Sequence, residues 1–250
     1  MYYPICTSPS VFEHALKAAA TNNMAIIFQV WTNFGNGEVW RESQQAIYDV
    51  LANPEYKTIA PYIVHSIEFG SEPVGDGMGG EHFVDDLANF RAMVQSTNIP
   101  VGISEDWDRP GSMSSQDGLG LGPVGRGVKA NSDVAHIHPM PFYHDYNGLV
   151  DDAWGYLKSQ TEWALRNVQL PTMISETQWA WGETPHNPGK ADIGIEQFGR
   201  FWKTIDAHCE YFKSMQVGWF FHAWHGEGTF DIVKPDGDGY MIPDWRPRKC

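Results

Sequence analysis

The sequence predicts an α/β fold, more specifically a TIM (β/α)8-type barrel. Six short apolar runs of strand length alternate with longer stretches of helical pattern. The runs begin about 33 to 45 residues apart, which suits repeated strand–helix units with loops. A length of 250 residues is normal for one barrel domain of this type.

Each of the six runs is apolar on both faces and partly β-branched, as the buried strands of a parallel sheet are. Eight strands would close the barrel, and we interpret YYPIC near the N-terminus as the tail of a seventh. We therefore expect a single barrel domain over residues 1–250, truncated at its N-terminus and lacking the first strand and helix. A natural open α/β sheet is the alternative. The predicted strands are residues 24–31, 62–70, 99–104, 132–138, 171–176 and 216–224.

Helices are predicted between the strands from apolar side chains that recur every three or four residues. Ser10 and Glu13 form a capping-box pattern ahead of HALKAAA. Cys209 falls on the longest apolar stripe, which predicts a buried apolar filler rather than a reactive thiol. A bridge between Cys6 and Cys250, near the two ends of the chain, stays open. The clearest stripes are Phe83, Leu87, Phe90 and Val94, and Ile195, Phe198, Trp202, Ile205, Cys209 and Phe212.

Composition and charge exclude several classes of partner. The formal net charge is −14 and the pI is near 5.0, and such an acidic surface repels the phosphates of nucleic acids and anionic lipids. No apolar run approaches the ~18 residues of a membrane helix, and MYYPICTSPS lacks the features of a signal peptide. We expect a monomer that binds a neutral ligand, with no nucleic acid partner, no membrane span, no metal and no cofactor.

Two glutamates stand at the ends of predicted strands, far apart in the sequence. Glu72 ends the apolar run of PYIVHSIEFGSEP, and Glu176 ends that of LPTMISETQWAWG. In a barrel of this type the carboxyl ends of the strands assemble the active site. The other strand-end positions supply carboxylates, imidazoles and aromatic rings: Trp31, Asn33, Glu105, Asp106, Trp107, His136, His138, Tyr143, Trp179, Trp181, His222, Trp224, His225 and Glu227.

A pair of carboxylates from different strands suits the cleavage of a glycosidic bond. One group protonates the leaving oxygen, and the other stabilises or attacks the anomeric carbon. In a retaining enzyme the two carboxyl groups lie about 5 to 5.5 Å apart. Tryptophans offer flat apolar faces to sugar rings and N–H donors to their hydroxyls. Glu68 shares the strand face of Glu72, and we interpret it as a buried structural carboxylate paired with a histidine.

Four segments resemble the motifs of glycoside hydrolase family 17. IEFGSEP resembles the acid/base motif V-G-N/S-E, and MISETQWAWG is similar to the nucleophile motif S-E-T-G-W-P. SDVAHIHPMPFY resembles the strand-six segment N-x-Y-P-F, and FFHAWHGEGTF resembles a degenerate strand-eight F-D-E segment. Gln178 replaces the usual glycine after S-E-T. Members of that family are retaining (β/α)8 enzymes that act on β-1,3-glucans by hydrolysis or by glucan transfer.

The resemblance implies a catalytic domain with Glu72 as acid/base and Glu176 as nucleophile. It places Ser71 where many relatives have an Asn that touches the sugar 2-hydroxyl, and it places His138 where a residue orients the nucleophile. It also implies β-glucan polysaccharide or oligosaccharide as the partner and an extracellular or cell-wall location. The predicted substrate-binding residues are Ser71, Trp31, Trp107, His138, Tyr143, Trp179, Trp181, Trp224 and Glu227.

Two other functions remain open. His136-Ile137-His138 has the H-x-H spacing that puts two imidazoles on one face of a strand. With His222, His225 or Asp106 this pair would suit a metal-dependent hydrolase. A shortened barrel with altered motifs would alternatively bind glucan without cleaving it.

Overall fold

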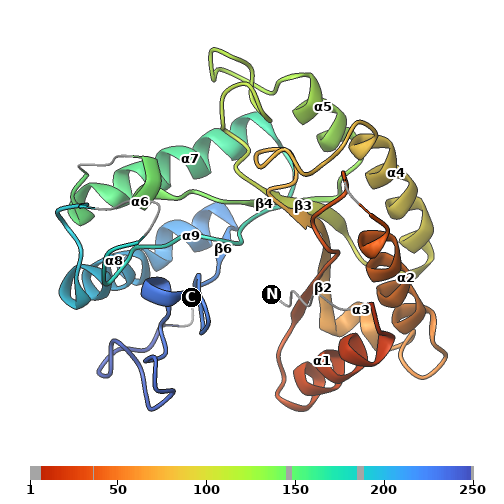
Figure 1. The fold of residues 1–250 in the computed structure, drawn as a ribbon, viewed down its shortest axis with the longest axis horizontal. Helices are drawn as coiled ribbons and strands as arrows, with labels where there is room; N and C mark the ends of the chain where they lie inside the picture. Colours follow the sequence, from red (N-terminus) through yellow and green to blue (C-terminus); the bar gives the residue numbers. More distant parts are fainter. Residues whose placement is uncertain (1–6, 36, 145–147, 185–188, 249–250) are drawn as a thin grey trace. The chain divides into compact units, whose positions relative to one another are not determined.

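The computed structural model describes residues 7–35, 37–144, 148–184 and 189–248 (Figure 1). Its backbone divides into two compact units. Unit 1 contains Met1–His136 and Asn167–Pro171, and unit 2 contains Ile137–Arg166 and Thr172–Cys250. No helix among the described residues combines the length and the apolar character that crossing a membrane requires.

The described residues form six strands in one sheet, in the sequential order β1-β2-β3-β4-β5-β6. The pairs β1–β2, β2–β3 and β5–β6 are parallel. Each strand overlaps one of the predicted runs, although β2 and β3 each end one residue later than predicted. The order is that of a (β/α) barrel, so the predicted α/β class is confirmed. The interpretation of residues 2–6 as a further strand lies outside the described residues. The strands are β1 (Ile26–Gln29), β2 (Val64–Ser71), β3 (Val101–Glu105), β4 (Val134–Ile137), β5 (Thr172–Ile174) and β6 (Gly218–Trp219).

Helical segments stand between all consecutive strands of this set (Figure 1). Those of unit 1 are α1 (Pro9–Thr21), α2 (Val39–Ala52), α3 (Ala60–Ile63), α4 (Phe83–Val94), the 3₁₀ turn η1 (Gln95–Thr97) and α5 (Pro123–Ala130). Those that follow β4 are α6 (Pro141–His144), η2 (Val150–Asp152), α7 (Ala153–Asn167), α8 (Ile195–Ala207), α9 (Cys209–Met215) and η3 (Gly228–Phe230).

Helix α1 begins at Pro9, one residue before the predicted cap. Proline at the first helical position has the φ angle that a helix needs, and its missing N–H is not required there. Ser8 is the N-cap residue but makes no capping bond with its side chain, and its hydroxyl lies 2.9 Å from that of Ser10. The predicted capping box of Ser10 and Glu13 is therefore wrong.

Aromatic rings from β2, α2 and α4 build the core of unit 1. Phe69 of β2 lies 5.1 Å from Phe90 and 5.7 Å from Phe83 of α4, and 5.9 Å from Trp40 of α2, measured between ring centroids. The four positions of the predicted α4 stripe are all buried. Because side chains alternate along a strand, Glu68 points to the face of β2 opposite Phe69 and away from these helices.

The longest predicted stripe is divided between α8 and α9 of unit 2, which are separated at His208. Ile195 at its start is 57 % exposed, whereas the rest of its apolar positions in α8, and Phe212 in α9, are buried. The buried face is crowded with rings: Phe201 and Trp202 lie 4.9 Å apart. The sequence pattern thus located the buried face but not the break between the helices.

Cys209 is disulfide-bonded, so the prediction of an apolar filler is wrong. Helical periodicity reports which face of a helix is buried, and it carries no information on whether a sulfur there is oxidised. The possible bridge between Cys6 and Cys250 involves residues outside the described part of the chain.

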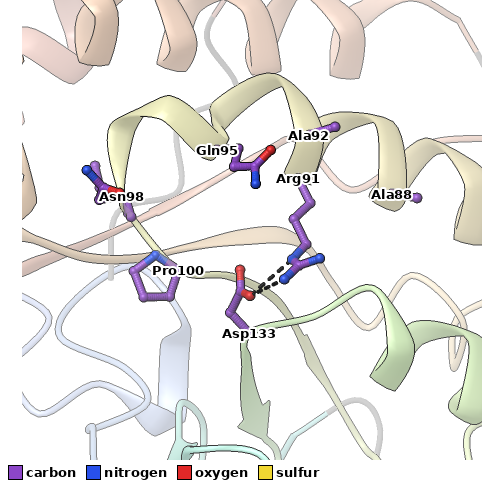
Figure 2. A pocket seen from close by; sticks show the side chains of 8 residues that line it. Ala88, Arg91, Ala92, Gln95, Asn98, Pro100 and Asp133 are labelled. Atoms are coloured by element: carbon purple, nitrogen blue, oxygen red, sulfur yellow. Dashed lines mark hydrogen bonds and ion pairs between the residues drawn. The ribbon is translucent and has the colours of Figure 1, made fainter.

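A surface hollow of about 430 Å³ lies beside α4 and the start of β3 in unit 1 (Figure 2). Arg91 of α4 donates from Nε (3.0 Å) and Nη2 (2.6 Å) to one carboxylate oxygen of Asp133. The other oxygen accepts from the backbone N–H of Val101 at 3.1 Å. Val101 begins β3, so the hollow belongs to the N-terminal edge of the strands, where barrel residues serve stability rather than chemistry.

The C-terminal segment is held on α8 by one buried carboxylate. Asp206, which is 5 % exposed, accepts from the backbone N–H of Arg248 at 2.7 Å and from Nε1 of Trp245 at 3.3 Å. Nε of Arg248 donates to the same carboxylate at 3.2 Å. The guanidinium side chain is 63 % exposed, so water screens most of its attraction to the carboxylate.

Replacement of Asp133 by Asn is expected to cost stability only above about pH 4. Partial burial acts to raise the pKa of Asp133, but the hydrogen bonds from Arg91 and Val101 and the charge of Arg91 outweigh it, so the pKa lies below its usual value. A carboxyl with a lowered folded pKa stabilises the fold above its unfolded pKa of about 3.9 and loses that effect as pH falls through the folded value. Because a third of the side chain is exposed, the difference should be under about 1 kcal/mol. Urea unfolding of both proteins between pH 3 and 7 measures it, and a difference that does not change with pH contradicts the assignment.

Replacement of Asp206 by Ala is expected to lower the free energy of unfolding by about 2 to 3 kcal/mol, because the indole N–H of Trp245 and the backbone N–H of Arg248 lose their acceptor. Arg248→Ala should cost under about 1 kcal/mol, since the exposed guanidinium contributes little and the backbone N–H remains. Thermal and urea unfolding of the two variants give both values. Equal losses would show that the ion pair, rather than the hydrogen bonds to these two N–H groups, holds the C-terminal segment on α8.

Candidate active site

The end of β2 turns sharply at the first predicted catalytic residue. Glu72 has a φ angle of 49°, and Gly70 two residues earlier has 90°. The N–H of Glu72 donates to the carbonyl of Ser104 in β3 at 2.7 Å, and that of Ser71 donates to Oγ1 of Thr32 at 3.0 Å. A left-handed conformation costs a non-glycine residue about 1 to 3 kcal/mol and tends to occur at functional sites. The neighbouring strands therefore hold Glu72 in a conformation that it would not adopt alone.

The loop after Glu72 is fixed by a second glutamate, which the sequence placed at a strand end without giving it a role. Glu105 is 0 % exposed, and its Oε2 accepts from the N–H groups of Val74 (3.0 Å) and Gly75 (3.1 Å). Its Oε1 accepts from the N–H of Asp106 at 2.9 Å. A Cβ at position 75 would lie 2.7 Å from Glu105 Oε1, so a larger residue there would have to displace this carboxylate.

Glu68 is a structural carboxylate, as predicted. It is 0 % exposed and lies 2.5 Å from Nδ1 of His136. Its other oxygen accepts from Nε2 of Gln29 at 2.8 Å. With both oxygens occupied and no exposure, Glu68 is not available to a substrate.

In unit 2 the second predicted catalytic residue lies beside two imidazoles. Glu176 Oε1 is 3.6 Å from Nε2 of His138, and Oε2 is 3.3 Å from Nδ1 of His222. The side chain of Glu176 is 16 % exposed, that of His222 is 25 % exposed and that of His138 is 0 % exposed. His138 thus stands where the resemblance expected an orienting residue. The sequence predicted His222 at a strand end but did not predict its contact with Glu176.

The serine and threonine of the S-E-T motif, on either side of Glu176, each form a hydrogen bond that fixes the motif. The N–H of Ser175 donates to the carbonyl of Ile137, the last residue of β4, at 3.1 Å. The hydroxyl of Thr177, which is 0 % exposed, donates to the carbonyl of Pro139 at 2.8 Å. Both bonds tie the motif to the segment that carries His138. The carboxylate and its imidazole neighbour are therefore positioned by the same backbone contacts.

The predicted aromatic platforms divide into buried and accessible rings. Trp107 and Trp179 are each 1 % exposed, and their Nε1 atoms donate to the carbonyls of His136 (3.0 Å) and Asp192 (2.9 Å). At this exposure neither ring presents a face to a sugar, and both pack the protein interior. The sequence could not foresee this, because the two carbonyls come from segments remote from the indoles.

The accessible rings are Trp224 at 62 % and Tyr143 at 37 %, while Trp31 and Trp181 are half-buried. Nε1 of Trp181 donates to the carbonyl of Asp231 at 3.2 Å. Glu227 is exposed, and its backbone N–H is held by a carboxylate oxygen of Asp231 at 2.8 Å. Of these four rings, Trp31 belongs to unit 1 and the other three belong to unit 2.

No group of three or more His, Cys, Asp or Glu side chains in the described ranges is arranged to hold a metal ion. The two imidazoles of the H-x-H segment have different partners, since His136 bonds Glu68 and Ser66 whereas His138 faces Glu176.

No protein-family model and no curated protein matches the sequence, but solved structures match its fold. The chain is similar to a glycoside hydrolase family 17 β-1,3-glucanosyltransferase from Rhizomucor miehei, with TM-score 0.65 and 19 % identity over 92 % of this chain and 80 % of that chain. It is similar to a family GH128 endo-β-1,3-glucanase from Amycolatopsis mediterranei, with TM-score 0.51 and 17 % identity over 86 % and 77 %. It is also similar to a β-glucuronidase from Bifidobacterium dentium, with TM-score 0.60 and 16 % identity over 93 % and 38 %. The likeness in fold agrees with the resemblance drawn from the motifs.

Replacement of Glu105 by Gln is expected to loosen the loop after Glu72. An amide presents one acceptor and one donor where the carboxylate presents two acceptors, so at least one backbone N–H loses its partner, at a cost of about 1 to 3 kcal/mol. Hydrogen exchange followed by mass spectrometry should show faster exchange in residues 73–80. Glu81→Gln, at an exposed position beside the loop, is the matched control. If residues 73–80 exchange at an unchanged rate in Glu105→Gln, Glu105 does not fix this loop.

Proposed function

We propose that the chain is a retaining glycoside hydrolase that acts on β-1,3-glucan, with Glu72 as acid/base and Glu176 as nucleophile. The observation that carries the proposal is the setting of Glu176, a partly exposed carboxylate at the end of a parallel strand with an imidazole beside each oxygen. The strained conformation of Glu72 at the end of another strand gives independent support. Solved structures of similar fold include glucan-active enzymes, one of them in complex with laminaritriose.

The reaction follows from the two carboxyl groups. In the first step an oxygen of Glu176 forms a bond to the anomeric carbon while the glycosidic C–O bond breaks, and Glu72 gives its proton to the leaving oxygen. In the second step Glu72 takes a proton from water or from a sugar hydroxyl, whose oxygen displaces Glu176 from the anomeric carbon. Water gives hydrolysis and a sugar hydroxyl gives transfer. His138 and His222 restrict the rotation of the Glu176 carboxylate and so keep an oxygen directed at the anomeric carbon.

The accessible rings fit a neutral sugar chain. Trp224 and Tyr143 present apolar faces to C–H groups, and Trp31 and Trp181 add partly exposed rings. Ser71 adjoins Glu72 and supplies a hydroxyl for the ring that is being cleaved, and Glu227 supplies an exposed carboxylate that accepts from sugar hydroxyls. A net charge of −14 places no penalty on an uncharged polysaccharide.

The disulfide at Cys209 supports an extracellular or cell-wall location, because disulfides persist in oxidising compartments and are rare in the cytosol. A wall polysaccharide would be met in such a compartment. We infer that the chain acts on glucan outside the cell, as a monomer.

Incubation with laminari-oligosaccharides tests the proposal. Glu176→Gln and Glu72→Gln should each lower the release of reducing ends by at least about 10²- to 10⁴-fold, since each removes a group that acts on the reacting atoms. Glu183→Gln, an exposed change seven residues from the nucleophile, should leave the rate unchanged. NMR spectra taken in the first minutes should show β-anomeric products, as retention requires. Binding without cleavage by the unaltered protein would favour a glucan-binding barrel instead, and full activity of Glu176→Gln would reject this nucleophile.

A further inference from the structure

A series of buried polar side chains runs through the interior of unit 1. Glu68 bonds His136 through Oε1 (2.5 Å) and Gln29 through Oε2 (2.8 Å). Nε2 of His136 lies 3.1 Å from Oγ of Ser66. Glu68, His136 and Ser66 are 0 % exposed, and Gln29 is 1 % exposed. Burying such polar groups costs free energy unless each of them is hydrogen-bonded, as these four are.

Ser66, His136 and Glu68 have the order of a serine-hydrolase triad, from hydroxyl to imidazole to carboxylate. A nucleophile must meet its substrate, and Ser66 is fully buried. Its hydroxyl also lies 3.0 Å from Nδ1 of His65. The trio therefore has no route to a substrate, and its role lies in what it connects.

The network links β2 to β4 across β3. Glu68 of β2 is in register with Gly102 of β3. A side chain at Gly102 would collide with the backbone carbonyl of Val134, so glycine is what lets β4 lie this close to β3. His136 of β4 then reaches past β3 to Glu68. The bond between a carboxylate and an imidazole is charge-assisted and directional, which makes it a stronger constraint than apolar packing at the same place.

His136 is also held through its backbone. Nε1 of Trp107, from the loop after β3, donates to the carbonyl of His136 at 3.0 Å. The histidine is thus fixed by its ring to β2 and by its carbonyl to the end of β3. Trp107, which the sequence assigned to the substrate, is part of this interior support.

Glu72 stands four residues beyond Glu68, where β2 ends. Its left-handed conformation persists only where the surrounding structure dictates it. The bonds that hold it come from Ser104 and, through Ser71, from Thr32, which lie in and beside the two neighbouring strands. Those bonds require that β2 keep its position between β1 and β3. Glu68 supplies that constraint in both directions, toward Gln29 on one side and His136 on the other.

We propose that Glu68 and His136 are positioning residues that fix the end of β2 and thereby the backbone of Glu72. The proposal rests on the proposed catalytic role of Glu72. Neither residue touches a sugar. Their contribution is to hold the strand from which the proton donor projects, so their loss should reduce the rate of bond cleavage rather than the binding of substrate.

The test removes the hydrogen bond between Glu68 and His136 without leaving an unpaired charge in the interior of unit 1. In the variant Glu68→Gln/His136→Phe the carboxylate and its imidazole partner are removed together, so no buried ion is left without a partner. We expect kcat on laminari-oligosaccharides to fall about tenfold or more, with KM within about twofold. Hydrogen exchange of residues 70–76 should become faster, while that of α1 is unchanged. The single variant His136→Gln, which keeps an N–H donor for Glu68, should retain most of the rate of the unaltered protein.

The exchange measurement separates this proposal from the proposed function. If residues 70–76 exchange at the unaltered rate in the double variant, the positioning role is overturned whatever the activity. If the protein is active and the double variant shows faster exchange but an unchanged kcat, the positioning role is also overturned. The bond between Glu68 and His136 would then not affect catalysis through Glu72. If the unaltered protein cleaves no glucan, the proposed function fails, and the exchange data still decide whether the pair fixes β2. Should the double variant not fold, Glu68→Gln alone, which keeps the shape of the side chain, carries the same measurements.

Discussion

The structure depends on carboxylates that are buried only where N–H groups meet their oxygens. An ionised carboxylate moved out of water without partners costs more than a domain of this size can offset. Each of the buried acids in the described ranges is at most 5 % exposed and accepts from at least two N–H groups. These acids are Glu68, Glu105, Asp206 and Asp231. Glu68 joins strands of the sheet, and the other three acids hold segments outside the strands.

Three of these acids take backbone N–H groups from irregular segments. Glu105 holds the loop after β2, Asp231 holds the N–H groups of Gly226 and Glu227, and Asp206 holds the C-terminal segment. Backbone N–H groups must be satisfied somewhere, and in each of these three segments a carboxylate accepts from them. A carboxylate there takes the place of the hydrogen bonds of regular structure, and these irregular segments gain rigidity from the core.

The sequence predicted the strands because buried parallel strands are apolar on both faces, a pattern that needs no knowledge of distant residues. It also identified Glu68 as structural, since strand alternation places that residue on the inner face. It failed where the outcome depends on a remote partner. The buried positions of Trp107 and Trp179 are set by carbonyls elsewhere in the chain, and the oxidation of Cys209 is set by another sulfur. The run 216–224 gave only β6 (Gly218–Trp219), because hydrogen bonding to a neighbour, and not apolar character, decides where a strand ends.

The kind of partner separates a structural carboxylate from one suited to chemistry. Glu105 is held by backbone N–H groups, which are permanent donors, so any change in its charge would release the loop that it fixes. Glu176 lies beside two imidazole side chains instead of backbone donors, and part of its own side chain is open to solvent. In the proposed reaction a bond to the anomeric carbon would cancel the charge of Glu176, and the two neighbours that face this change are imidazole side chains. Strand-end position alone does not distinguish the two glutamates, whereas the groups that face them do.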